Sequence, residues 1–106
     1  MNDFDERALH TPHVTRSTAS ADTVSKVGDW NVWTCEVSEF TYNYQRRVSF
    51  LVREGTADLA FETGERVSIR PRDFITIEVG SVVSWRVTSA VRNSFCYHDT
   101  FPEGAS

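Results

Sequence analysis

Few residues of this sequence could act as an acid or a base near neutral pH. His98 is the one histidine beyond residue 13. It could serve as a general acid or base, or it could be an exposed or hydrogen-bonded side chain at the end of a strand. Glu78 lies just before Gly80. Burial there would raise its pKa and make it a base, whereas exposure would leave it a solvated acid. The sequence leaves both alternatives open.

Two residue spacings are compatible with a catalytic Cys/His pair and with a histidine metal site, but the geometry and the neighbouring residues argue against both. Cys96 and His98 share one face of a predicted strand, roughly 7 Å apart, which is too far for a direct hydrogen bond in a catalytic dyad. His10 and His13 have H-x-x-H spacing, but without a nearby cysteine or a convincing helix we expect solvated loop histidines. Cys35 and Cys96 are too few for a disulfide framework, so we expect reduced thiols, and a bridge between neighbouring strands stays open.

Aromatic residues dominate the remaining candidates for a binding site. Residues 40–45 alternate aromatic and polar side chains, which places Phe40, Tyr42 and Tyr44 on one face of a strand. If that face is internal, and Trp85 on a second alternating segment is internal as well, the interior is aromatic with phenol hydroxyls as its polar groups. Such a pocket suits a planar or apolar small molecule. Alternatively, these rings simply fill the core.

Short strands must position these side chains. They recur every eight to twelve residues with turn residues between them, which predicts an all-β sandwich or barrel. Gly64 is expected to form the tight turn of a hairpin. The predicted strands are 40–45, 48–52, 56–61, 66–71, 73–79, 82–88 and 91–99.

Composition indicates one domain with loosely held ends. Residues 1–26 are rich in Ser, Thr, Asp and Ala and contain a single aromatic, so we expect a flexible or loosely docked arm. Residues 27–101 would form the barrel and residues 102–106 a disordered tail. The net charge of −4 argues against a nucleic-acid partner. Without a long apolar run or a secretory signal, we expect no membrane contact and a cytoplasmic location.

The residues of a wider set follow one another along the chain in an order that is typical of a known family. The order is a tryptophan-rich start, a glutamate–phenylalanine pair, a Glu-Gly strand end, two turns, a tryptophan and a Val-Arg pair. The residues are Trp30, Trp33, Glu39, Phe40, Glu54, Gly55, Asp73, Gly80, Trp85, Val91 and Arg92. Over residues 28–98 this pattern resembles a small single-domain cupin of the ureidoglycine aminohydrolase-type cupin family. The resemblance implies a double-stranded β-helix, or jelly-roll barrel, whose mouth binds a ligand.

The resemblance also locates the positions at which metal-binding cupins carry their ligands, namely three histidines and a glutamate. Counting from the two motif glycines places these positions at Tyr42, Tyr44, Val48 and Val83. Valine offers no lone pair, and two phenols without an imidazole would be an unusual site. We therefore expect no bound metal and no cofactor. Arg92 would either pair with Asp73 or Glu39, or bind a substrate carboxylate.

These observations predict a metal-free cupin that binds a small organic molecule through Tyr42, Tyr44, Trp85 and Arg92. It could also catalyse proton transfer, isomerisation or cyclisation, with Tyr44, Glu78 and His98 as candidates. One alternative is a non-catalytic dimeric structural or regulatory module, and another is a metal-dependent enzyme with atypical ligands such as His98 and Glu78. A cavity of roughly 300 Å³ or more would favour binding, and a packed interior would favour the module. We expect a homodimer in either case.

Overall fold

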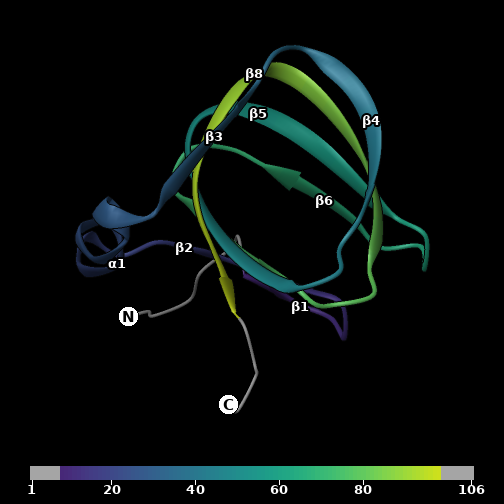
Figure 1. The fold of residues 1–106 in the computed structure, drawn as a ribbon, viewed down its shortest axis with the longest axis horizontal. Helices are drawn as coiled ribbons and strands as arrows, with labels where there is room; N and C mark the ends of the chain where they lie inside the picture. Colours follow the sequence, from purple (N-terminus) through teal and green to yellow (C-terminus); the bar gives the residue numbers. More distant parts are fainter. Residues whose placement is uncertain (1–7, 99–106) are drawn as a thin grey trace.

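The computed structural model describes residues 8–98, which form one antiparallel sheet that curls into a barrel (Figure 1). The sheet order is β1–β2–β7–β5–β8–β3, with β4 also paired to β8 and β6 to β5. The helical segments are α1 (Ala21–Lys26) and the 3-10 turn η1 (Val27–Asp29). The strands are β1 (Leu9–His10), β2 (Val14–Thr18), β3 (Asn31–Cys35), β4 (Ser38–Asn43), β5 (Arg47–Phe61), β6 (Arg66–Ile69), β7 (Asp73–Ile77) and β8 (Val82–His98).

Two long strands, β5 and β8, hold the barrel together. They pair antiparallel from Arg47 opposite His98 to Phe61 opposite Val83, with register shifts near the middle of β5. The sequence predicted two separate strands along each of them. The structure keeps each strand continuous because the bulge at Gly55 bends the ladder without ending it. Each long strand therefore contributes side chains to both ends of the barrel.

The core follows the alternation of side chains along these strands. On β8 the residues Val83, Trp85 and Val87 are buried while their neighbours in sequence point to solvent. The first half of β5 is buried on both faces, because Leu51 packs outward against Ala19 from the segment before α1 and Val27 of η1. Barrel interior and outer helical cover thus form two apolar clusters.

The amino-terminal segment differs from the arm that its composition predicts. Residues 14–18 form β2, which pairs along its length with β7, and Val14 is fully buried. The helix α1 begins at an N-cap in which Ser20 accepts a hydrogen bond from the Thr23 amide. A polar strand of this kind is held by backbone pairing with its neighbour, which residue composition does not report. Residues 1–7 and 99–106, including the predicted tail at 102–106, lie outside the described residues.

The α-helix α1 has six residues, and no helical segment within residues 8–98 could span a lipid bilayer.

Candidate functional site

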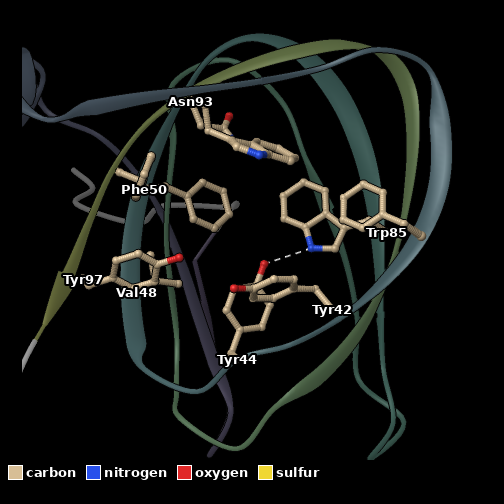
Figure 2. A pocket seen from close by; sticks show the side chains of 10 residues that line it. Tyr42, Tyr44, Val48, Phe50, Trp85, Asn93 and Tyr97 are labelled. Carbon is tan, nitrogen blue, oxygen red and sulfur yellow. Dashed lines mark hydrogen bonds between the residues drawn. The ribbon is translucent and has the colours of Figure 1, made fainter.

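An aromatic cavity of about 140 Å³ lies at one end of the barrel and is partly open to solvent (Figure 2). Its walls come from β3, β4, β5 and β8, together with the residue that follows β4. The volume is below the roughly 300 Å³ expected for a drug-sized ligand. It is close to the ~150 Å³ at which an apolar cavity in another protein binds benzene. The lining residues are Trp33, Phe40, Tyr42, Tyr44, Val48, Phe50, Trp85, Asn93, Phe95 and Tyr97.

The pairing of β4 with β8 explains why rings gather here. Phe40 lies opposite Trp85 in the register, and their rings stack with centroids 5.8 Å apart and planes 10° apart. Trp33 on β3 meets the same indole edge-on at 5.4 Å. The alternation in residues 40–45 predicted that Phe40, Tyr42 and Tyr44 share one face of the chain, and in the structure all three line the cavity.

A buried hydrogen bond links two of the predicted binding residues. The indole Nε1–H of Trp85 donates to the hydroxyl oxygen of Tyr44 over 3.0 Å (Figure 2). Burial raises the pKa of the Tyr44 phenol, so this side chain stays neutral at physiological pH. Because the oxygen already accepts from the indole, the phenolic hydrogen is available to donate to a third group.

Two further tyrosines form the rim of the cavity. Tyr42 is 44% exposed and contacts the Tyr44 ring edge-on at 4.7 Å. Burial and a hydrogen bond with Tyr42 raise the pKa of Tyr97. The guanidinium of Arg46 lies 4.2 Å from the centre of the Tyr97 ring, a cation–π contact. The rim therefore combines phenol groups with one stacked cation.

Asn93 is a lining residue that the sequence reasoning missed. It is 2% exposed, and its side-chain oxygen Oδ1 has no hydrogen-bond partner within the described part of the chain. A signal was present, because Val91, Asn93 and Phe95 alternate on the inner face of β8 and the asparagine is the polar member.

Two candidates for catalysis lie away from this cavity. Glu78 follows β7 and forms an ion pair with Arg47, with Oε2 3.1 Å from Nε. His98 lies on the face of β8 opposite to Tyr97, and its Nε2 is 2.7 Å from the Oγ of Ser49. Neither side chain lines the cavity: Glu78 is held in its ion pair with Arg47, and strand alternation turns His98 to the face of β8 opposite to Tyr97.

Arg92 is also displaced from its predicted place. It is paired across the ladder with Glu54, its guanidinium Nη1 3.4 Å from Oε2, and it does not line the cavity. The expected partners are engaged elsewhere: Glu39 meets Arg86 at 3.8 Å, and Asp73 accepts from the Arg70 amide at 3.0 Å. Arg92 therefore points to the surface, since it alternates with the inward Val91 and Asn93.

The remaining cysteine and histidine predictions have mixed outcomes. Cys35 and Cys96 are both free and half-buried, which agrees with reduced thiols. His10 is exposed. His13 is not simply solvated, because its Nδ1 lies 2.9 Å from Oε2 of Glu65 in the turn between β5 and β6.

The four positions that the resemblance assigned to metal ligands are not suited to a cation in this chain. Val83 is fully buried and Val48 nearly so, and both present only hydrocarbon. Tyr44 is kept protonated by burial and already accepts a hydrogen bond. Within residues 8–98 no group of three or more His, Cys, Asp or Glu side chains is placed to bind a metal ion. The donor set of the cavity therefore does not fit a metal centre.

Comparison with known proteins agrees with this architecture. Residues 23–95 match the EutQ-like cupin domain, and the chain belongs to that family. The barrel is accordingly the jelly roll of the cupins, as the sequence predicted. The assignment to the ureidoglycine aminohydrolase-type group stays a prediction. The comparison with curated proteins found no match.

Several solved structures share the fold. A DUF861 family protein from Thermotoga maritima is 25% identical with a TM-score of 0.77, over 80% of this chain and 99% of that chain. The EutQ protein of Clostridium difficile is 19% identical with a TM-score of 0.60, over 90% and 78%. A putative ethanolamine utilization protein Q from Salmonella typhimurium is 17% identical with a TM-score of 0.58, over 79% and 68%.

Proposed function

We propose that this cupin domain binds a small, neutral organic molecule in its aromatic cavity and does so without a metal ion. The observation that carries the proposal is the cavity itself, which is left unfilled between Phe50, Trp85 and Tyr44. At about 140 Å³ the cavity does not reach the roughly 300 Å³ expected for a drug-sized ligand, so the proposal is restricted to a molecule of about one ring. The lining described here is aromatic and uncharged, which favours burial of an apolar ring over burial of an ion.

The arrangement supports binding better than acid–base catalysis. Of the three catalytic candidates, only Tyr44 lines the cavity, and burial raises the pKa of its phenol. It can donate a hydrogen bond to a ligand, but it cannot act as a base near neutral pH. Glu78 and His98 are engaged outside the cavity, and Arg92 is excluded from the proposed binding residues for the same reason.

Titration with toluene tests the proposal, because toluene is apolar and close to the size of the cavity. We expect saturable shifts of the Trp85 indole N–H resonance in NMR spectra, with a dissociation constant of about 1 mM or tighter. Val48→Phe places a ring in the cavity and should abolish the shifts, while Val32→Phe on the exposed face of β3 should not. Absence of binding to the unsubstituted protein at saturating toluene would refute the proposal.

A further inference from the structure

The hydroxyl group of Tyr44 has a hydrogen that the described chain does not use. A phenol can accept hydrogen bonds and can also donate one. The Tyr44 oxygen accepts from the indole Nε1–H of Trp85 over 3.0 Å, and this is the one hydrogen bond that the hydroxyl makes within residues 8–98. Burial raises the pKa of the phenol, so the hydroxyl keeps its hydrogen at physiological pH. The acceptor for this hydrogen must therefore come from outside the described chain.

The Tyr44 hydroxyl lies where a ligand in the cavity could reach it. Tyr44 lines the cavity together with Trp85, Phe50 and Tyr97, and the cavity is partly open to solvent. Figure 2 shows the Tyr44 oxygen directed toward the space among these rings, with the indole on one side of it. The hydroxyl hydrogen must avoid the indole N–H, so it points away from Trp85. In Figure 2 the rings of Phe50 and Tyr97 lie on that side.

The other phenols of the rim are engaged with each other. The hydroxyls of Tyr42 and Tyr97 share a hydrogen bond, and Tyr42 is 44% exposed, so water completes its hydrogen bonding. A ligand that fills the cavity excludes water from the hydroxyl of Tyr44. If that ligand has no acceptor, it leaves a buried donor unpaired, and the penalty weakens its binding. The cavity therefore discriminates among rings of similar size.

On the basis of the proposed function, we propose that the site selects neutral, single-ring molecules whose carbonyl, nitrile or ether group accepts a hydrogen bond from the Tyr44 hydroxyl. The single ring follows from the volume of about 140 Å³. Neutrality follows from the uncharged lining, since a buried ion would lack a counter-charge. The bond from Trp85 strengthens the selection, because a hydroxyl whose oxygen accepts a hydrogen bond is polarised into a stronger donor.

Benzonitrile and toluene test this selection, because they share one ring and the nitrile adds a strong acceptor. Tyr44→Phe alone would free the Trp85 indole to donate in its place, so both compared variants carry Trp85→Phe. The variants Trp85→Phe and Trp85→Phe/Tyr44→Phe then differ by one hydroxyl group. Dissociation constants for both probes are measured by NMR titration. We expect loss of the hydroxyl to weaken benzonitrile binding about fivefold relative to toluene, as expected for one hydrogen bond.

The outcomes separate this inference from the proposed function. If toluene fails to bind the unsubstituted protein, the cavity is not a ligand site and the proposed function falls. If toluene binds but its affinity relative to benzonitrile is the same in the two variants, the Tyr44 hydroxyl does not select an acceptor and this inference falls alone.

Two measurements on the unsubstituted protein cover the case in which the variants do not fold. The Cζ resonance of Tyr44, the carbon that carries the hydroxyl, should shift differently with benzonitrile than with toluene, since both probes bring the same ring. The infrared C≡N stretch of bound benzonitrile should lie at a higher frequency than in hexane, as for a hydrogen-bonded nitrile. A stretch at the hexane value, or equal Cζ shifts with both probes, would overturn the assignment.

Discussion

At the scale of single residues, the hydrogen bond between Trp85 and Tyr44 links two side chains that line the cavity. The indole N–H donates to a phenol that is itself buried. We expect Tyr44→Phe to lower the free energy of unfolding by about 1 kcal/mol, because the indole loses its acceptor. Chemical denaturation measures this change. Tyr42→Phe is the control, because Tyr42 is 44% exposed and water can take the place of its hydroxyl as the partner of Tyr97. A larger loss for Tyr42→Phe would contradict the assigned roles.

The sequence predicted part of this residue-level arrangement. Period-two alternation in residues 40–45 placed Tyr42 and Tyr44 on one face, which lines the cavity, and the same rule applied to β8 would have found Asn93. It could not place Glu78 or His98, because their partners Arg47 and Ser49 lie 31 and 49 residues away. Such partners are set by strand register, which local patterns do not specify.

Among the elements, the contact between the β1–β2 turn and the β5–β6 turn depends on one carboxylate. Hydrogen bonds from Thr63, His13 and Thr11 lower the pKa of Glu65 from 4.5 to about 2. A carboxylate with a lowered pKa stabilises the fold above its unfolded-state value, and the contribution is lost as pH falls through the folded value. The stability advantage over Glu65→Gln should therefore shrink between about pH 4.5 and pH 2.

Denaturation curves over this pH range measure the effect. The exposed Glu62→Gln in the same turn is the control and should follow the unsubstituted protein. A difference between Glu65→Gln and the unsubstituted protein that stays constant with pH would contradict the ionic role of Glu65.

The bulge in β5 depends on a glycine. Gly55 has a φ of +85°, and a Cβ added there would lie 2.1 Å from the carbonyl oxygen of Ala90. We expect Gly55→Ala to reduce the free energy of unfolding by more than about 2 kcal/mol. Gly28→Ala, where nothing lies within 4 Å of the added Cβ, should change it by less than about 0.5 kcal/mol. Thermal or chemical denaturation distinguishes the two, and equal effects would contradict the steric argument.

Secondary structure was predictable where apolar and polar residues alternate, and less so elsewhere. The strand pattern predicted the all-β class. It also predicted a tight turn at Gly64, which has a positive φ of 107° in the structure. The pattern did not reveal that β5 and β8 are continuous, because a bulge and a turn contain similar residues. It also missed β2, whose polar residues are held by pairing with β7.

For the molecule as a whole, assembly is a separate proposal. The strand β3 ends the described sheet order, and Val32 on it is 54% exposed, with Val37 beyond it 66% exposed. A second copy of the chain is the occupant we expect, since pairing of two such edges would cover both valines. Light scattering at micromolar concentration should give about twice 12.1 kDa. A mass near 12.1 kDa would exclude the dimer under these conditions.

A crystal structure of the protein, purified without chelators and soaked in toluene, tests the central claim most directly. We predict flat, ring-shaped density between Phe50, Trp85 and Asn93, with no anomalous peak from a metal. An anomalous peak beside Tyr42 and Tyr44, or a cavity without ring density at saturating toluene, would contradict the account.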